Sequence, residues 1–304
     1  MTDPRPRSGT WTRARGVDRG LRIWLREGIP PSDVDALRRC AVDEPHWQAL
    51  PKLAQAPRSS VARLQWSSGP VVVKRYIDPG AFRLRTFARR SRAEREACAL
   101  DLVGSVLPEN PVRALAWAEQ RRLGLVARSY LVTAELEESF DLRRIKTLDP
   151  PQRDDAIRVV QEQLSRLLAR LHAANVVART LRGKNALLQP ASGRIALIDL
   201  PYARAVTRLG VRQRIRDLAI LSLELRRFLD AEDWNRFLAA YRAEAGDLAA
   251  RDADRICADR IARRAKRLGH RTGLSAATRA AKRRFRHSGI GEWVTGHRYR
   301  GEPD

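Results

Sequence analysis

Four side chains of this sequence have the chemistry to bind a polyphosphate and its metal ion. Lys74 ends an apolar run with strand character, and Glu96 lies in a following segment with helical spacing, where it can pair with Lys74. Asn185 and Asp199 flank a predicted short hairpin, which brings an amide oxygen and a carboxylate to one place. Phosphoryl transfer needs a cation on the phosphates and oxygen ligands for Mg²⁺. These residues therefore predict a site for ATP and Mg²⁺, with Asn185 and Asp199 as the metal ligands.

The segment 171–188 strengthens this interpretation because its order of residues resembles the catalytic-loop pattern of protein kinases, LHxxGxxHRDLxxxNxLL. Asn185 falls on the Asn of that pattern, and Asp199 on the metal-binding Asp that follows it. Arg182 falls where many kinases carry a Lys that contacts the transferred phosphate. A single Lys at a strand end, a single Glu on a helix or a single Asp in a turn is common in any protein. The evidence for a kinase-like site is therefore the order in which all of these residues follow one another along the chain. Glu94 is an alternative partner for the strand Lys.

Two departures from the kinase pattern concern the chemistry itself. Thr180 stands at the position of the catalytic base, where kinases have Asp. The phosphate-covering loop, expected near residues 58–62, has no Gly, although Ser59 and Ser60 are small enough to let backbone N–H groups approach a phosphate. A missing general base costs a factor of about 10²–10⁴ in rate. Three outcomes stay open: a slow kinase, a kinase with a base from elsewhere in the chain, or a nucleotide-binding pseudokinase.

The elements that must position these residues follow from periodicity. A β-rich segment with one helix precedes a mostly helical segment that has a small hairpin at its start. The predicted fold class is α+β, a bilobal protein-kinase-like fold with a small β-rich N-lobe, one αC-type helix and a larger helical C-lobe. Expected strands span residues 60–66, 71–76, 112–117, 123–135, 186–188 and 195–199, with turns at 67–70 and 121–122, and expected helices span 82–103, 157–171, 214–229 and 234–241.

Composition shifts along the chain suggest four parts. Residues 1–57 are an N-terminal extension, 58–136 the kinase-like N-lobe, 137–250 the kinase-like C-lobe, and 251–304 a basic helical C-terminal extension. No apolar run approaches the roughly 20 residues that cross a bilayer.

The charge of the chain is strongly positive, with 59 basic and 35 acidic residues and a net charge of +24. Of the basic residues 53 are Arg and six are Lys, a preference that fits a G+C-rich genome. The net positive charge predicts attraction to polyanions such as phosphorylated glycans or anionic lipid surfaces. A nucleic-acid-binding protein is a third hypothesis that rests on charge alone. The sequence has no zinc-ligand spacing and no RNA-binding signature that would support it.

Taken together, several segments resemble the lipopolysaccharide kinase family of bacteria, which phosphorylates Kdo or heptose. The resemblance extends over about residues 58–290. It implies that Glu135 and Leu136 form the hinge that holds adenine, and that Asp217 accepts backbone N–H groups of the catalytic loop. It also implies a cytoplasmic enzyme at the inner leaflet that uses ATP and Mg²⁺ on a lipid-linked core oligosaccharide or other anionic glycan. The segments that carry it are 72–76, 91–96, 123–125, 131–133, 198–204, 214–221 and the basic stretches 263–267 and 283–286.

Two functions therefore compete. The favoured one is a phosphotransferase that acts on an alcohol group of a core sugar, slowed by Thr180. The alternative is a catalytically impaired pseudokinase that serves as a nucleotide-binding or scaffold module at the inner membrane surface. The acceptor hydroxyl, the choice between a sugar and a protein acceptor, and the oligomeric state do not follow from the sequence.

Overall fold

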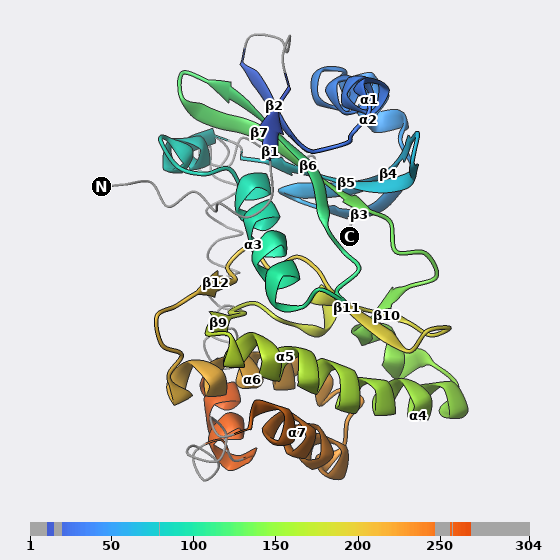
Figure 1. Cartoon of the computed structure of the whole chain (residues 1–304), viewed down its shortest axis with the longest axis vertical. Coiled ribbons are helices and arrows are strands. Elements are labelled where there is room, and N and C mark those ends of the chain that lie inside the picture. Colours follow the sequence, from blue (N-terminus) through green and yellow to red (C-terminus); the bar gives the residue numbers. More distant parts are fainter. Residues whose placement is uncertain (1–10, 15–19, 79, 247–255, 257, 269–304) are drawn as a thin grey trace, which may run out of the picture. The chain divides into compact units, whose positions relative to one another are not determined.

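The structure is a computed structural model that describes residues 11–14, 20–78, 80–246, 256 and 258–268 (Figure 1). The chain divides into two compact units, which we call the sheet unit and the helical unit. The sheet unit contains the described residues up to 98 and residues 113–135, and the helical unit contains residues 99–112 and the described residues from 136 onward. A sheet-based unit and a helix-based unit in one chain confirm the predicted α+β class.

The sheet unit is built on seven antiparallel strands in the order β1-β2-β6-β7-β5-β4-β3. Helices α1 (Pro31–Val42) and α2 (Glu44–Ala49) contribute buried side chains to the same core as the sheet, among them Leu37 and Trp47. The strands are β1 (Trp11–Arg13), β2 (Leu21–Arg26), β3 (Lys52–Ala56), β4 (Ser59–Trp66), β5 (Gly69–Ile77), β6 (Ala114–Arg122) and β7 (Leu125–Ala134).

Side-chain alternation along β5 assigns its two faces. Val71 and Val73 are buried in the core shared with α1 and α2, and Arg75 pairs with Glu44 of α2. Because successive side chains of a strand point to opposite faces, Lys74 lies on the other face. The apolar run that predicted this strand did not indicate its faces, because Val72 lies on the same face as Lys74.

The first 57 residues contribute directly to this sheet. Strands β1, β2 and β3 come from that segment, and β2 pairs with β6 while β3 pairs with β4. The division at residues 57, 136 and 250 stays a prediction, but the N-terminal segment is part of the seven-stranded sheet. Of the basic C-terminal part, residues 258–268 are helical, and residues 269–304 lie outside the described residues.

Two local predictions in the sheet unit were wrong. The helix expected over 82–103 is a 3₁₀ turn, η1 (Gly80–Thr86), followed by helix α3 (Arg92–Val106). Ser91 stops the helix from starting earlier, because its hydroxyl accepts the N–H of Glu94 at 3.1 Å as an N-cap. The turn expected at 121–122 lies at Leu123 and Gly124, which have φ of 50° and 77°. Strand β6 continues through both arginines before that turn.

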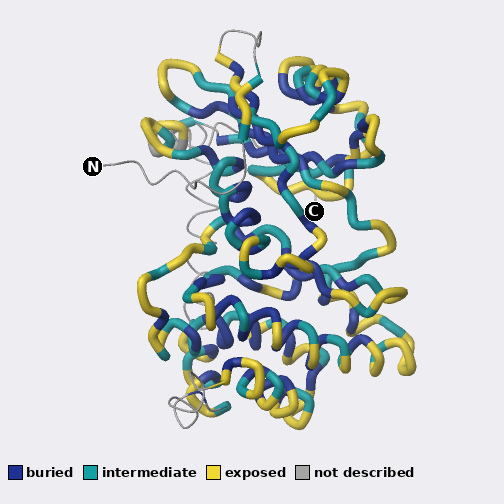
Figure 2. Tube along the Cα trace, in the orientation of Figure 1, coloured by how far each residue is buried: buried dark blue, intermediate teal, exposed yellow. Residues whose placement is uncertain are grey.

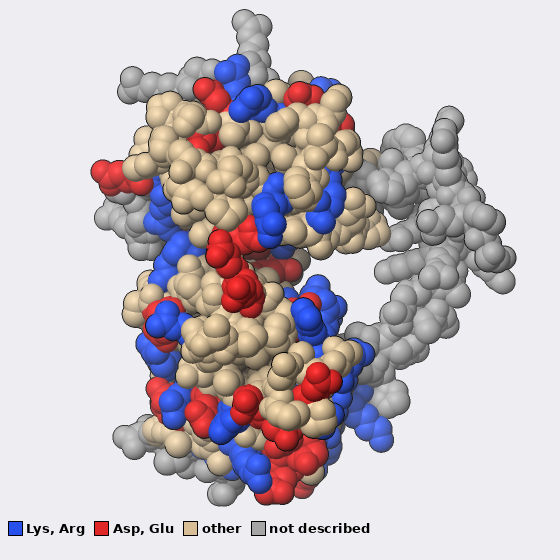
Figure 3. All heavy atoms as spheres, turned by 90° about the vertical axis from the view of Figure 1, so that its right-hand side faces the viewer, with Lys and Arg blue, Asp and Glu red and all other residues tan. Residues whose placement is uncertain are grey.

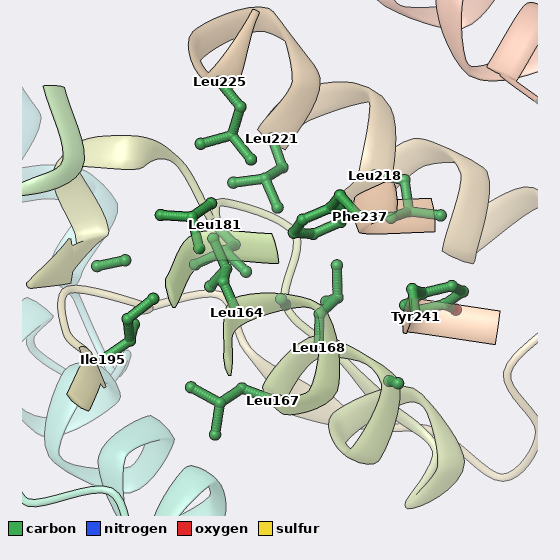
Figure 4. Close-up of a cluster of buried hydrophobic side chains, with 14 of the residues drawn as sticks. Leu164, Leu167, Leu168, Leu181, Ile195, Leu218, Leu221, Leu225, Phe237 and Tyr241 are labelled. Carbon is green, nitrogen blue, oxygen red and sulfur yellow. The ribbon is translucent and has the colours of Figure 1, made fainter. Parts of the chain in front are cut away.

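The helical unit has one long helix at its centre. Helix α4 (Pro150–Val159), the π-helical segment η3 (Val160–Leu164) and helix α5 (Ser165–Ala173) follow one another without a break. Helices α6 (Val211–Leu225) and α7 (Ala231–Ala245) belong to the same unit, and each has buried and exposed faces (Figure 2). Figure 4 shows the core between them, where leucines of the central helix and α6 meet Phe237 and Tyr241 of α7.

Short elements connect these helices and carry the predicted hairpin. Strands β10 (Ala186–Gln189) and β11 (Arg194–Leu197) pair antiparallel, as predicted, and β10 also pairs with β8 (Phe140–Asp141). The remaining short elements are η2 (Leu142–Thr147), β9 (Val176–Val177), η4 (Gly183–Asn185) and β12 (Arg204–Ala205). Within the described ranges, no helix is both long enough and apolar enough to cross a membrane.

Candidate functional site

The sheet unit brings Lys74 and Glu96 together. Lys74 Nζ lies 3.2 Å from both carboxylate oxygens of Glu96, which projects from α3. The Lys74 side chain is 17% exposed and that of Glu96 is 4% exposed. Glu94, the alternative partner, lies beside Arg90 at 3.5 Å. The pair leaves the ammonium accessible while its carboxylate partner is buried, which is the arrangement that a phosphate-binding Lys requires.

Tyr76 is a third member of this cluster that sequence reasoning missed. It follows Lys74 by two residues and therefore lies on the same face of β5. Its hydroxyl donates to Glu96 Oε2, and Lys74 Nζ lies 5.1 Å from the centroid of its ring. The period of two was the available signal, because it places residues 74 and 76 side by side facing α3. Tyr76 thus holds the Glu96 carboxylate from a second direction.

The expected phosphate-covering loop is shorter than predicted. Pro57 and Arg58 form a two-residue turn between β3 and β4, so Ser59 and Ser60 are already the first residues of β4. Ser59 is paired with Tyr76 and Ser60 with Arg75 across the adjacent strand. The Ser60 hydroxyl is buried without a hydrogen-bond partner among the described residues. Their contact with a nucleotide stays a prediction.

The predicted hinge residues lie where the chain passes from one unit to the other. The division falls between Glu135 and Leu136, directly after β7. The Glu135 carboxylate accepts from Arg63 Nε at 2.7 Å, and its N–H donates to the carbonyl oxygen of Pro70 at 3.3 Å. The Leu136 carbonyl accepts from the Ser139 hydroxyl at 2.7 Å. Their role in holding adenine stays a prediction, and several of their polar groups already have partners within the chain.

In the helical unit, Asp217 anchors the loop that follows α5. Its carboxylate accepts the N–H of Ala178 at 2.8 Å and the N–H of Arg179 at 3.0 Å. Asp217 is 1% exposed. This is the contact that the family resemblance implied for Asp217, and the structure confirms it. The loop is thereby fixed at the residues just before Thr180.

Behind this anchor lies a buried imidazole. His172 Nε2 is 3.4 Å from Asp217 Oδ2, and its Nδ1 is 2.8 Å from the hydroxyl of Tyr241 on α7. Burial lowers the pKa of His172 below its ordinary 6.5, although Asp217 acts in the opposite direction. His172 is therefore neutral near pH 7 and bridges α5, α6 and α7 through hydrogen bonds.

Thr180 itself has no partner for its hydroxyl. Its Oγ1 is buried without a hydrogen bond to any described residue, and its N–H lies 2.6 Å from the Ala178 carbonyl oxygen. Arg179, just before it, has φ of 56°, so the backbone is left-handed at this point. Arg182 is exposed two residues further along. The base position thus offers a hydroxyl and no carboxylate.

Asn185 and Asp199 meet at the base of the β10–β11 hairpin. Asn185 Nδ2 donates to the Asp199 carbonyl oxygen at 2.9 Å, and the N–H of Ile198 donates to the Asn185 carbonyl oxygen at 2.8 Å. Asn185 Oδ1 is buried and receives no hydrogen bond from the described residues. A buried amide oxygen without a donor is costly unless a ligand uses it. This amide oxygen, together with the carboxylate of Asp199, whose backbone carbonyl oxygen binds the same amide group, has the donor chemistry that fits Mg²⁺, a hard cation with oxygen ligands.

Asn110 supports this hairpin and was also missed. Its amide group donates to the Leu197 carbonyl at 3.3 Å and accepts the Leu197 N–H at 2.8 Å. Leu197 ends β11, two residues before Asp199. Sequence spacing gives no sign of a contact between positions 87 residues apart.

Among the described residues no group of three His, Cys, Asp or Glu side chains could hold a metal by itself.

Comparison with known proteins assigns the family. The family model described as "Lipopolysaccharide kinase (Kdo/WaaP) family" matches residues 83–241, which is 159 of the 304 residues. The matched range contains Glu96, Thr180, Asn185, Asp199 and Asp217, and it begins after the strand Lys. A solved structure described as "WaaP in complex with acyl carrier protein" is 22% identical, with a TM-score of 0.49 over 73% of this chain and 90% of that chain. The search among curated proteins found no match. Since the family model covers more than half of its length, the chain belongs to the lipopolysaccharide kinase (Kdo/WaaP) family.

Proposed function

We propose that this chain transfers the γ-phosphoryl group of ATP to a hydroxyl of a lipopolysaccharide core sugar, with Mg²⁺ as cofactor. The observation that carries the proposal is the Asn185 amide oxygen, which is buried beside Asp199 without a hydrogen-bond donor from the described residues. Family membership supplies the reaction class, and this oxygen supplies a place for the metal ion.

Each residue would have a limited task, because phosphoryl transfer depends mainly on position and charge. Lys74 would neutralise phosphate charge, and Glu96 would hold its ammonium in place. Asn185 and Asp199 would hold Mg²⁺, which would neutralise negative charge on the phosphates. Arg182 would stabilise the charge on the transferred group. Ser59 and Ser60 would contact phosphate from the start of β4, although β4 is paired on both edges and its backbone N–H groups therefore belong to the sheet. Glu135 and Leu136 would contact adenine through their backbone.

Thr180 favours a second candidate, a nucleotide-binding pseudokinase that acts as a scaffold. A threonine hydroxyl does not accept a proton near neutral pH, and this one has no described partner that would activate it. The family's reaction would then proceed slowly or not at all, while ATP and Mg²⁺ would still bind. Binding and turnover therefore have to be measured separately.

The acceptor and the location form part of the same proposal. A lipid-linked core oligosaccharide is anionic, and a chain with a net charge of +24 is attracted to it and to an anionic inner leaflet on the cytoplasmic side. The face drawn in Figure 3 carries both basic and acidic side chains, so its charge is not a single uniform patch.

The proposal is tested by thermal unfolding of the full chain with ATP, with Mg²⁺ and with both. Ligand at 100 times its Kd stabilises the folded state by about 2.7 kcal/mol. We expect a rise in melting temperature that needs both ATP and Mg²⁺ and that is lost in Asp199→Asn. Asn is the appropriate replacement because Asp199 has φ of 49°, a conformation that Asn tolerates. The control is Asp155→Asn, whose side chain is 69% exposed.

An ATP effect that does not need Mg²⁺, or that is unchanged in Asp199→Asn, would contradict the proposed metal site. Turnover is followed by transfer of radioactive phosphate from ATP to deacylated core oligosaccharide. Metal-dependent binding without transfer would select the pseudokinase.

A further inference from the structure

The helical unit contains a cavity of about 330 Å³ that no role described so far uses. Its size falls at the lower end of the range for small-molecule sites. Three elements form it: the end of β8, the turn η2, and the C-terminal end of α6 with the residues just after it. The residues that line it are Asp141, Arg143, Arg144, Lys146, Glu224, Arg227 and Phe228.

This cavity borders the turn that carries Asn185. Gly183, in the same turn η4, packs so closely that an added Cβ would lie 3.2 Å from Glu224 Oε2 and 3.6 Å from Arg143 Cγ. Arg143 lowers the pKa of Asp141 through a hydrogen bond, and Lys184 of η4 contributes to the same shift. The elements η2, η4 and α6 also contact one another. A ligand in the cavity would therefore lie next to the proposed metal-binding turn.

The lining has more positive than negative charge, and most of its positive charge has no carboxylate partner. Arg143 is held by Asp141 through two hydrogen bonds, of 2.9 and 2.7 Å. Among the described residues, Arg144, Lys146 and Arg227 form no ion pair. Three unpaired cations around one small cavity favour a ligand with an oxyanion, which guanidinium groups bind in a bidentate manner.

Glu224 adds a second chemical requirement. Its Oε2 is buried and receives no hydrogen bond from the described residues. A carboxylate oxygen in that position needs a donor, and an anion alone offers none. A sugar hydroxyl is such a donor. The ligand that satisfies both the cations and Glu224 is a polyhydroxylated ring that also carries a phosphate or a carboxylate.

We propose that this cavity binds the acidic sugar unit of the acceptor, with Arg144, Lys146 and Arg227 around its oxyanion and Glu224 accepting one of its hydroxyls. The assignment rests on the proposed function, because it assumes that a sugar acceptor is phosphorylated at the neighbouring turn. The cavity assignment goes beyond the proposed function by naming the residues that recognise the acceptor. Under this assignment the acceptor binds with the same affinity whether or not the nucleotide is present.

The test is the affinity of the full chain for deacylated lipopolysaccharide core oligosaccharide, measured by calorimetry without ATP. Lys146→Gln and Arg227→Gln each remove one cation from the lining, and we expect each to weaken binding roughly tenfold or more. The control is Arg226→Gln, since Arg226 is exposed next to Arg227 but does not line the cavity. We expect its affinity to stay within about twofold of the unmodified chain.

Chemically altered oligosaccharides identify the oxyanion. If a phosphate is recognised, phosphatase treatment abolishes the difference between Arg227→Gln and the unmodified chain; if a carboxylate is recognised, carboxyl reduction does so. The cavity assignment is overturned if the oligosaccharide does not bind, if Arg226→Gln loses as much affinity as Arg227→Gln, or if neither chemical treatment matters. Stabilisation by MgATP is measured on the same variants and stays unchanged under our proposal. If MgATP does not stabilise the unmodified chain, that result contradicts the proposed nucleotide site instead.

Discussion

Replacing Asp217 with Asn tests whether the loop before Thr180 is held in the way its hydrogen bonds suggest. The Asp217 carboxylate accepts two backbone N–H groups, from Ala178 and Arg179, and it is 1% exposed. Asn has nearly the same shape but offers one acceptor oxygen and one NH₂ group. Whichever way the amide is oriented, one of the two backbone N–H groups then faces a donor instead of an acceptor.

The magnitude follows from these two bonds. A hydrogen bond to a charged group contributes about 1.5–3 kcal/mol, and the one that survives in Asp217→Asn becomes a neutral bond of roughly half the strength. We therefore expect the free energy of unfolding to fall by about 2–4 kcal/mol. That is a large part of the 5–15 kcal/mol that typically stabilises a folded protein. At an m-value of about 2 kcal/mol/M, the urea midpoint falls by roughly 1–2 M.

The assay combines urea unfolding with hydrogen exchange of the peptide that contains the loop. The chain has seven Trp residues, so unfolding is followed by far-ultraviolet circular dichroism, which reports mainly on helices such as α4 to α7 of the helical unit. Exchange of the Ala178 and Arg179 amides should rise above that of the unmodified chain. Asp155→Asn, on an exposed helix face, serves as the control and should change stability by less than about 0.5 kcal/mol. Loop amides that stay protected in Asp217→Asn, with a stability loss no larger than the control's, would refute the reasoning.

Three further predictions follow from the same contacts. Tyr76→Phe removes the hydroxyl that donates to Glu96, and we expect a loss of about 1–2 kcal/mol in urea unfolding and a smaller stabilisation by MgATP; an unchanged value of both would contradict the role of Tyr76. Burial lowers the pKa of His172 below 6.5, so the unfolded chain binds the proton first as pH falls. The contribution of His172 to the free energy of unfolding should therefore be fully present above pH 6.5 and decline below it by up to about 1.4 kcal/mol per pH unit. His172→Gln should flatten that decline when unfolding is measured from pH 7 to 5. Thr180→Asp restores a base and should raise phosphate transfer about 10²–10⁴-fold, whereas no gain would favour the pseudokinase.

The parts of the site that periodicity determines could be predicted from the sequence. The apolar run before it placed Lys74 on a strand, and the turn between two short strands placed Asn185 beside Asp199. Both arrangements depend on residues that are close in sequence or share one strand. The start of α3 was predicted wrongly, although the sequence contains a signal for it. Ser91 and Glu94 have the spacing of a capping box, and the helix begins at the residue after Ser91.

What could not be predicted depends on contacts between distant residues. Asn110 reaches Leu197 through an amide that has no periodic signature, and Gly183 packs on Glu224 from a different helix. The turn at Leu123 and Gly124 was misplaced because charged residues on an exposed strand end resemble a turn in composition. In each case the partner is selected by the folded geometry, whereas the sequence pattern records only burial and spacing.

The backbone around Thr180 bears on the choice between enzyme and scaffold. Asn175, Arg179 and Asp199 all have left-handed φ angles, of 58°, 56° and 49°. Asn and Asp adopt such a conformation readily, whereas for Arg179 it costs of order 1–3 kcal/mol and persists only where surrounding contacts enforce it. Asp217 enforces it by binding the N–H of Arg179. A scaffold needs only the outer surface of the helical unit, and a relaxed loop would serve it better. The strain that Asp217 holds in place at Arg179, next to Thr180, instead favours a site that would still position phosphate and acceptor, even though Thr180 cannot take up the proton.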